Sequence, residues 1–357
     1  MATSLLKLIS IGFILVSSFP PQAVSASGDC ETESNSCKDK TGALPLKLIA
    51  IVSILVTSMI GVCIPLVTRS VPAMRPDRNL FVIVKSFAAS IILASGFMHV
   101  LPDSFDMLRS KCLKESPWHK FPFSGLLAML SAVVTLMVDS MATSIYSQKR
   151  NIGVMPDSTT STNATHGDGQ EMFVARTGLS LASHLGVKKG SADSQVQLLR
   201  YRVVAMVLEL GIDVHSVVIG LSLGASSNIC TIKGLLVALC FHQMLEGMGF
   251  GGCILQAEYN LLKRVIMVFF FSVTTPFGIA LGIALSKAYK ENSPSSLITV
   301  GLLNASSAGI MIYMALVDLL FADFMGPTMQ ACIKLQIKSY IAVLLGAGGM
   351  SLMAKWE

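Results

Sequence analysis

Long apolar runs dominate the chain and limit the folds open to it. Each approaches the roughly 20 residues that a helix needs to cross the hydrocarbon core of a bilayer. Backbone polar groups in lipid must be satisfied internally, so helices are the expected structure. The sequence predicts an all-α, polytopic membrane protein with eight transmembrane helices, at residues 44–68, 80–103, 123–146, 203–225, 231–255, 264–286, 297–322 and 335–354.

Composition agrees with a membrane protein. Hydrophobic residues make up 52% of the 357 positions and charged residues only 13%, whereas soluble domains carry roughly a quarter charged residues. The mean hydropathy is +0.66. The net charge of +6 is spread along the chain without a basic and aromatic patch, so no nucleic-acid partner is expected.

The N-terminus has the pattern of a secretory signal. Lys7 precedes an apolar run at residues 8–16, and the small residues of "AVSAS" follow. This pattern predicts a signal peptide over residues 1–26, cleaved near Ala26, with an uncleaved first helix as the alternative. Residues 27–43 would then form an extracytoplasmic tail.

The charge distribution predicts an orientation. Eight spans with the N-terminus outside put the C-terminal residues 355–357 outside as well. Basic residues follow the first, third and fifth spans and then lie on the cytoplasmic side, as the positive-inside rule requires. They include Arg69, Arg75, Arg78, Lys149, Arg150, Lys263 and Arg264. We expect the plasma membrane, with a vacuolar membrane left open.

The longest connection runs over residues 147–202 and separates transmembrane helices 1–3 (44–146) from helices 4–8 (203–354). It is rich in Ser, Thr, Gly and charge, which predicts a flexible cytoplasmic loop. The glycosylation sequon at Asn163 would therefore be unused. A second sequon, at Asn304, lies within the seventh predicted span.

The eight cysteines fall into two groups. Cys30 and Cys37 lie in the predicted extracytoplasmic tail, where a disulfide can persist, although the sequence does not decide whether they pair. The others have no C-x-x-C spacing and are interpreted as small buried apolar residues. They are Cys63, Cys112, Cys230, Cys240, Cys253 and Cys332.

Ionisable residues gather in the fourth and fifth predicted spans. Such residues cost several kcal/mol in a membrane and by default mark a pathway or a binding site. His242 and Glu246 are four residues apart, so they share a helix face and can reach one metal ion. Antiparallel packing would bring His215 of the preceding span to the same depth. This donor set suits zinc and tolerates iron or manganese, while ordinary interhelical hydrogen bonds are the alternative.

Further acidic and histidine residues lie toward the span ends. His99 and Asp103, four residues apart near the outer end of the second span, are interpreted as an access route for cations, or as wet interfacial residues. Glu209 and Asp213 would line a cytoplasmic exit, or pair with Lys85 or Lys233. Two residues near the inner end of the seventh span, Asp318 and Asp323, are interpreted as interfacial anchors, with a role in the exit as the alternative.

Four stretches resemble the plant branch of the ZIP (Zrt-, Irt-like) metal transporters: "HSVVIGLSLG" (215–224), "FHQMLEGMGFGG" (241–252), "ASGFMHVLPDSF" (94–105) and "SSAGIMIYMALVDLLFADF" (306–324). The resemblance implies an eight-helix fold with both termini outside and import of zinc, iron, manganese or related divalent ions as substrate, with no prosthetic group. It also implies metal ligation by His215, His242 and Glu246, next to Ser216 and Gln243, with His99 and Asp103 on the access route.

Two departures from the family pattern limit what is carried over. Some branches place a carboxylate one turn after the histidine of the fourth helix, where this chain has Ile219, which argues against a second bridged metal. Many members have a run of alternating histidines in the long loop. Here that loop has only His166 and His184, which argues against metal sensing by a histidine cluster.

The function predicted is secondary transport by alternating access. Zinc is the expected substrate, with iron, manganese or copper as alternatives. A homodimer is compatible with the sequence. Acid pH should weaken substrate affinity, because metal ligands must be deprotonated. The alternatives are an intramembrane metalloenzyme and a multi-span receptor. The chain has no H-E-x-x-H motif and no phosphate-binding G-x-x-x-x-G-K-[ST] loop, so neither that metalloprotease signature nor ATP-driven pumping is indicated.

Overall fold

The computed structural model describes residues 40–68, 79–152, 174–286 and 293–353, and their fold is built from helices. The predicted signal peptide, the pairing of Cys30 and Cys37, and the sequon at Asn163 all concern residues outside these ranges. The described part therefore covers the membrane-spanning region that the sequence predicts and leaves those three predictions untested.

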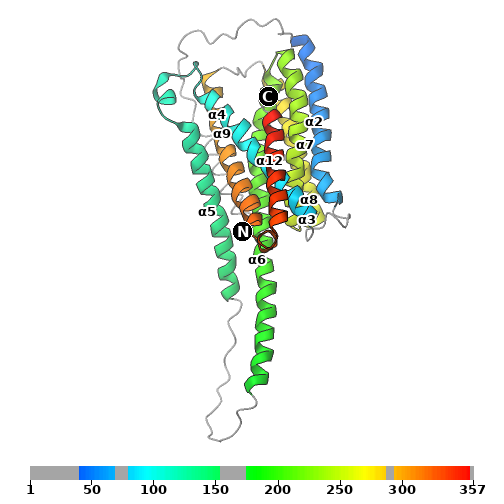
Figure 1. The fold of residues 1–357 in the computed structure, drawn as a ribbon. Helices are drawn as coiled ribbons and strands as arrows, with labels where there is room; N and C mark the ends of the chain where they lie inside the picture. The colour runs from blue at the N-terminus through cyan, green and yellow to red at the C-terminus, as the bar shows by residue number, and fades with distance from the viewer. Residues whose placement is uncertain (1–39, 69–78, 153–173, 287–292, 354–357) are drawn as a thin grey trace.

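Two of the long helices contain a π-helical segment, marked η. The elements are α2 (Lys40–Thr68), α3 (Asn79–Ser95), η2 (Gly96–Val100), α4 (Leu101–Leu108), η3 (Glu115–His119), α5 (Phe123–Ile152), α6 (Val174–Ala225), α7 (Ile229–Gln256), α8 (Leu261–Leu285), α9 (Pro294–Tyr313), η4 (Met314–Phe321), α10 (Ala322–Phe324), α11 (Pro327–Gln330) and α12 (Ile333–Met353). We call the end with α4 and the start of α2 the upper end, and the end from which α6 projects the lower end (Figure 1).

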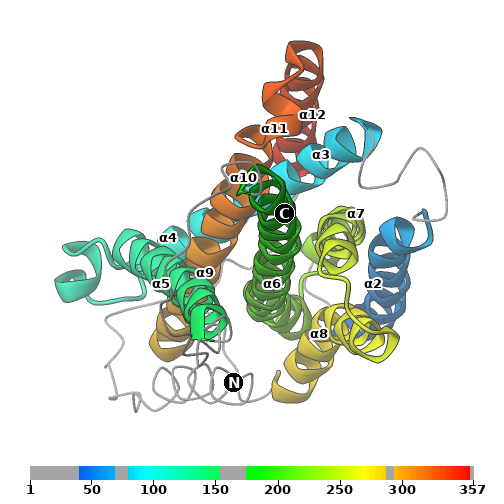
Figure 2. The ribbon, with the colours of Figure 1, turned by 90° about the horizontal axis from the view of Figure 1, so that it is seen from below.

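Seven stretches within the described ranges are long and apolar enough to cross a membrane. They are Gly42–Thr68, Asn79–Leu108, Phe123–Ala142, Gln197–Ala225, Leu261–Leu285, Pro294–Phe324 and Ile333–Met353. The fifth predicted span, α7, is not among them. Its polar His242, Gln243 and Glu246 and its glycines reduce its hydropathy. It nevertheless runs beside α2 in both views, and eight spans remain a prediction (Figures 1 and 2).

The expectation of a flexible coil over residues 147–202 is wrong for its two ends. α5 continues to Ile152, and α6 begins at Val174 and runs unbroken into the fourth span. No proline occurs between Pro156 and Pro276, and leucine, alanine, lysine and glutamine favour a helix once the apolar span has nucleated it. The prediction of coil rested on the polarity of residues 147–202. Polarity indicates that a segment is exposed to water, but it does not determine whether its backbone is helical.

Close backbone contacts through glycine join α2 to α7 and α6 to α8. We call these four helices the first helix group. On α7, a Cβ at Gly251 would overlap the carbonyl oxygen of Val62 on α2. On α6, a Cβ at Gly224 would overlap the carbonyl oxygen of Ile279 on α8. Small residues of this kind allow helix backbones to approach closely in lipid.

Polar contacts at the lower end also join α6 to the turn between α7 and α8. The Nε of Arg202 donates to the carbonyl of Ala257 at 3.0 Å, and the hydroxyl of Tyr259 donates to the carbonyl of Arg202 at 2.8 Å. Burial raises the pKa of Tyr259 to about 12, so this hydroxyl stays a proton donor at physiological pH. The first helix group is thus held together at this end as well.

The remaining long helices form the second helix group: α3 with η2 and α4; α5; α9 with η4 and α10; and α12. A Cβ at Gly309 on α9 would overlap the backbone of Ala128 on α5. A Cβ at Gly346 on α12 would overlap the hydroxyl of Ser90 on α3. Seen along the bundle, α6 lies between α9 on one side and α7 and α8 on the other (Figure 2).

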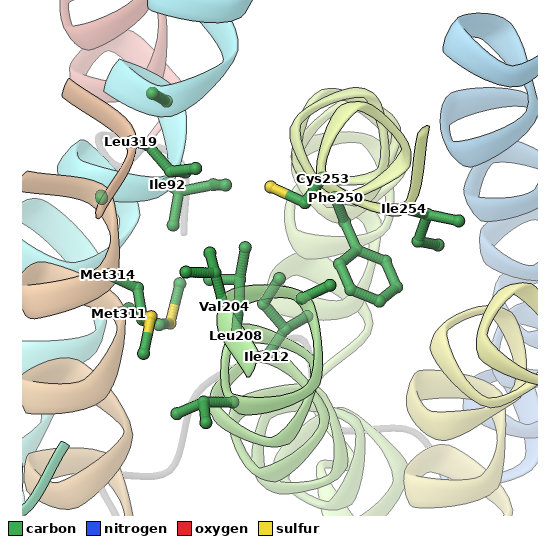
Figure 3. Close-up of a cluster of buried hydrophobic side chains, with 14 of the residues drawn as sticks. Ile92, Val204, Leu208, Ile212, Phe250, Cys253, Ile254, Met311, Met314 and Leu319 are labelled. Atoms are coloured by element: carbon green, nitrogen blue, oxygen red, sulfur yellow. The ribbon is translucent and has the colours of Figure 1, made fainter. Parts of the chain in front are cut away.

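The interface between the two groups is packed by side chains. Val204, Leu208 and Ile212 on α6 are spaced by four residues and share a face. They lie between residues of α7 and residues of α9, η4 and α3 (Figure 3). Those neighbours are Phe250, Cys253, Ile254, Met311, Met314, Leu319 and Ile92.

Two glycines at this interface face side chains of the other group. A Cβ at Gly211 would meet side-chain atoms of Ile310, the nearest at 3.0 Å, and one at Gly249 would first meet the side chain of Ile92, at 2.8 Å. Side-chain ends can shift, whereas backbone cannot. These two contacts between the groups can therefore adjust more easily than the backbone contacts at Gly251, Gly224 and Gly309.

The π-helical segment η2 has a cause in the sequence. Pro102 has no N–H, and its ring disfavours the ordinary α-helical turn before it. The N–H of Leu101 donates to the carbonyl of Gly96, five residues back, as a π-helix requires. This wider turn carries His99.

Two cysteines depart from the buried apolar interpretation. Cys112 and Cys230 are disulfide-bonded. Cys112 lies in the connection between α4 and α5, and Cys230 lies exposed at the start of α7, so both are away from the apolar core. The absence of C-x-x-C spacing concerned short metal or redox motifs and could not exclude pairing between distant residues.

Candidate metal centre

Three histidines from different elements meet near the middle of the bundle. His99 comes from η2, His215 from α6 and His242 from α7. The ring centroids of His99 and His215 are 5.3 Å apart, those of His99 and His242 5.6 Å, and those of His215 and His242 5.7 Å. The three imidazoles therefore form a compact triangle between the two helix groups.

Glu246 lies next to this triangle, one turn after His242 on α7. Its Oε2 is 3.4 Å from the Nε2 of His242, and its side chain is completely buried. A buried carboxylate is costly unless a cation or hydrogen-bond donors compensate its charge. Glu246 thus gives the site a negative group that requires a positive partner.

Several polar atoms of the site make no hydrogen bond within the described part of the chain. They are both ring nitrogens of His215, the Oγ of Ser216, the Nε2 of Gln243 and both carboxylate oxygens of Glu246. All four residues are almost completely buried. Buried polar groups in folded proteins are nearly always satisfied, so a cluster of exceptions requires an explanation.

The donor atoms do not form a finished coordination shell. Among the described residues, no three His, Cys, Asp or Glu side chains are placed to hold a metal ion as they stand. The rings of His99 and His215 meet edge to face, at an interplanar angle of 81°. Rotation of the side chains would be needed before their nitrogens could converge on one ion.

His99 lies deeper than its place near the end of the second predicted span suggested. Its side chain is 7% exposed, whereas that of Asp103 is 39% exposed. The Nε2 of His99 is 3.9 Å from the Oδ2 of Asp103. Asp103 therefore lies on the upper, more exposed side of the histidine triangle, and His99 is part of the triangle.

Glu209 and Asp213 lie on α6, on the lower side of His215. Thr274 on α8 donates to the Oδ1 of Asp213 at 3.4 Å. Asp213 is also near enough to Glu246 to interact with it electrostatically, as Glu209 is with Asp213. Acidic side chains thus continue from the triangle toward the lower end.

Lys85 is not the partner of these two carboxylates. Its Nζ is 2.7 Å from the Oδ1 of Asp323, which lies in α10 at the lower end of the bundle. Lys85 was one of two cationic partners proposed from sequence for Glu209 and Asp213. The structure instead pairs it with a residue interpreted from sequence as an interfacial anchor.

Comparison with known proteins fits this arrangement. A sequence profile of the family described as "ZIP Zinc transporter" matches residues 44–354. The chain belongs to the ZIP family. The match covers all three elements that supply the histidine triangle, so the site lies within the family's own region.

The ZIP chain is similar to curated plant proteins over nearly its whole length. It is 60% identical to "Probable zinc transporter 10" of Arabidopsis thaliana, over 96% of this chain and 94% of the relative. It is also 60% identical to "Fe(2+) transport protein 1" of the same plant, over 99% and 98%. A rice protein, "Fe(2+) transport protein 1", is 53% identical over 96% and 92%.

Sequence reasoning grouped most of these residues but placed His99 apart from them. His215, His242 and Glu246 lie together as the spacing indicated, and Ser216 and Gln243, which the resemblance added, are buried. His99 was expected on the access route alone, because counting along a span gives depth only for a regular helix. The proline three residues later, Pro102, is the signal that could have suggested a local change of geometry.

Proposed function

We propose that the chain carries a divalent transition-metal ion across a membrane, with His215, His242 and Glu246 as its ligands and His99 as a fourth. The observation that carries this proposal is the buried triangle of histidine rings beside a fully buried carboxylate. Buried ionisable groups in a membrane by default indicate a substrate pathway.

The ring spacing supports metal binding. Two imidazoles that bind one zinc ion tetrahedrally, with nitrogens at about 2.0–2.1 Å, have ring centroids roughly 5 Å apart. The three spacings of 5.3–5.7 Å are close to that value. Rotation about the side-chain bonds, without a large backbone movement, would direct the nitrogens toward a common point.

The charge of the site supports a cation as substrate. Glu246 offsets part of the energy that a divalent ion loses when it leaves water. A bound cation would also satisfy the buried atoms of His215 and Glu246 that make no hydrogen bond in the described structure. Ser216 and Gln243 could orient the ligands or retained water molecules.

The proposed route runs along the bundle. A hydrated ion would come from the upper end past Asp103, bind at the triangle, and leave past Asp213 and Glu209 toward the lower end. The graded exposure of Asp103 and His99 supports the first step, and the Thr274–Asp213–Glu246 neighbourhood supports the last. Binding must remain moderate, because an ion that is held too tightly cannot leave.

The two helix groups supply the parts that alternating access needs. His215, His242 and Glu246 belong to the first group and His99 to the second. Backbone contacts at Gly251 and Gly224 hold α7 to α2 and α6 to α8, while side chains fill the surface between the groups. Movement of one group past the other would change the side from which the histidine triangle can be reached.

Zinc is the first candidate for the substrate. The relatives named above include a probable zinc transporter and two Fe(2+) transport proteins at comparable identity. Imidazole and carboxylate ligands accept zinc, iron and manganese, so geometry and metal availability decide the selectivity. Iron is therefore the second candidate, and competition between the two metals is part of the test.

Topology and location complete the proposal. The upper end would face the outside, so that the chain has eight spans, both termini outside, a cleaved signal peptide and a cytoplasmic connection over residues 147–202, in the plasma membrane. Basic residues at the lower end, among them Arg200, Arg202 and Lys263, fit the cytoplasmic side. The role is that of a transporter and not of an enzyme or receptor.

The test is zinc uptake in yeast that lacks its own zinc importers. Cells expressing the parent chain, His215→Ala and Glu246→Ala are compared at equal surface protein. His119→Ala and Glu258→Ala are matched controls, because these residues are exposed and lie away from the site. Iron and manganese are added as competitors.

Uptake by the parent and both controls, with loss in both site variants, would support the ligand assignment. A parent without metal uptake would overturn transport. Site variants that transport as fast as the parent would overturn the ligand assignment and leave these buried residues with a structural role.

A further inference from the structure

Within the described residues, hydrogen bonds link α6 of the first helix group to the second group at two places. In the middle of the bundle, the Oγ of Ser307 on α9 donates to the carbonyl of Gly211 at 2.6 Å, one turn before His215. At the lower end, Arg200 at the start of the fourth span contacts Asp318 of η4. The second contact is an ion pair between two elements that transport would move apart.

The Arg200–Asp318 pair is short and unequally exposed. The Nη2 of Arg200 lies 2.6 Å from the Oδ1 of Asp318, and its Nε lies 3.2 Å from the same oxygen. The side chain of Arg200 is 37% exposed, whereas that of Asp318 is completely buried. The arginine side chain can therefore rotate away from the pair toward the surface, whereas the buried carboxylate cannot.

The surroundings make this pair important for charge balance. Asp139 on α5 and Tyr313 on α9 are both near enough to interact electrostatically with Arg200 and Asp318. Two carboxylates thus face one guanidinium. Removing the partner from a buried charge is strongly unfavourable, so this pair opposes separation of α6 from η4.

A cation–π contact lies beside the Arg200–Asp318 pair at the lower end. Tyr201, the next residue on α6, has its ring 5.7 Å from the Nζ of Lys85 on α3. Lys85 is itself paired with Asp323, and both of these residues belong to the second helix group. Arg200 and Tyr201 therefore rest against charged residues that the second group holds in place.

We propose that Arg200 and Asp318 form a latch that holds the lower end of α6 against η4 and must open once in each transport cycle. The two are positioning residues: they lie away from the histidine triangle and act through the placement of α6, which carries His215. This inference rests on the proposed transport function. Their charges would set how readily the helix groups exchange positions, and not how tightly the metal binds.

The first test fixes the latch chemically. Arg200→Cys and Asp318→Cys are combined and treated with a bismethanethiosulfonate reagent of short spacer, which a reductant reverses. The matched control is Arg202→Cys with Tyr259→Cys, whose side chains meet at the same end but within the first helix group, with the guanidinium 5.7 Å from the ring centroid. The four single-cysteine variants control for reaction with native thiols such as Cys253 and Cys332.

Cross-linking of Arg200→Cys/Asp318→Cys should reduce zinc uptake at least about ten-fold, with recovery after reduction, while the control pair keeps more than about half of its uptake. Mass spectrometry verifies the cross-link. A verified cross-link that leaves uptake within about two-fold would overturn the latch. If the parent transports zinc and the cross-linked pair does too, only the latch fails and the transport function stands.

Charge variants give a second, independent measurement. Arg200→Gln should lower Vmax at least about five-fold at equal surface protein with KM changed less than about two-fold, whereas Arg200→Lys retains most of the rate. If the double-cysteine variant is inactive before treatment, the comparison of Arg200→Gln with Arg200→Lys still tests the latch. An Arg200→Gln variant with the parent's Vmax, or one whose loss is entirely in KM, would contradict the proposal.

Discussion

The imidazole ring of His99 lies 5.3 Å from that of His215, although the two residues come from different helix groups. His99 sits on the π-helical turn before Pro102, and His215 sits on a regular turn of α6. A metal ion bound by both would bridge the two groups. Relative movement of the groups would then change the coordination of the ion, which gives His99 a more central role than access alone.

The first prediction concerns this histidine. If His99 is a ligand, His99→Ala should raise the KM for zinc at least about ten-fold, because removing a group that supports a metal site typically costs that much affinity. KM and Vmax are measured from initial uptake rates at equal surface protein. His119→Ala, which removes an exposed histidine, should leave both constants unchanged.

A different outcome would assign His99 to the access route only. In that case the variant would lose Vmax while its KM stayed within about two-fold of the parent value. Binding of zinc to the purified protein, followed by calorimetry, separates the two outcomes directly. A ligand loss weakens equilibrium binding, whereas a slower access step does not.

Hydropathy was sufficient to predict most of the helices. The apolar runs at residues 44–68, 123–146 and 264–286 coincide closely with α2, the first part of α5, and α8, because a lipid-facing helix must be apolar over its whole length. Hydropathy alone is a weaker guide for α7, whose interior carries the polar residues of the site. The apolar run at residues 231–255 still predicted this helix, and the spacing of His242 and Glu246 placed them on one of its faces.

Other features could not be predicted from local patterns. The meeting of His99 with His215 depends on the packing of three helices and on the wider turn at η2. The pairing of Arg200 with Asp318 joins the predicted loop 147–202 to the seventh predicted span, residues far apart in the sequence. No local sequence signal explains the π-helical segment η4, since it contains no proline.

The second prediction concerns the exit. Asp213→Asn keeps the size of the side chain but removes a negative charge between Glu246 and the lower end. A departing cation would lose an intermediate position, so Vmax should fall about three- to ten-fold with little change in KM. Thr274→Val, which removes the hydroxyl that donates to Asp213 but keeps the carboxylate, should have a smaller effect.

Uptake kinetics of the two variants provide the measurement. An Asp213→Asn variant with a raised KM and an unchanged Vmax would make Asp213 a metal ligand and not part of an exit. A variant that matches the parent in both constants would remove Asp213 from the route altogether.

The third prediction concerns pH. Imidazole binds a metal only in its deprotonated form, so protons compete with zinc for the histidine triangle. The KM for zinc should therefore rise as the external pH falls from neutral to about pH 5, the range in which histidine side chains commonly change charge. Initial uptake rates at fixed free zinc activity give KM at each pH, and a constant KM would argue against histidine ligation.

The last prediction tests the rigid packing of the first helix group with two adjacent glycines. A Cβ at Gly251 would overlap the carbonyl oxygen of Val62, whereas a Cβ at Gly252 would have no heavy atom within 4 Å among the neighbours considered in the described structure. Gly251→Ala should therefore destabilise the protein by about 1–3 kcal/mol, the usual range for overpacking. Gly252→Ala should be neutral or stabilising by up to about 1 kcal/mol, because alanine favours the helix. Thermal unfolding of the two purified variants in the same detergent compares them directly, and equal midpoints would show that α2 and α7 are not packed through Gly251.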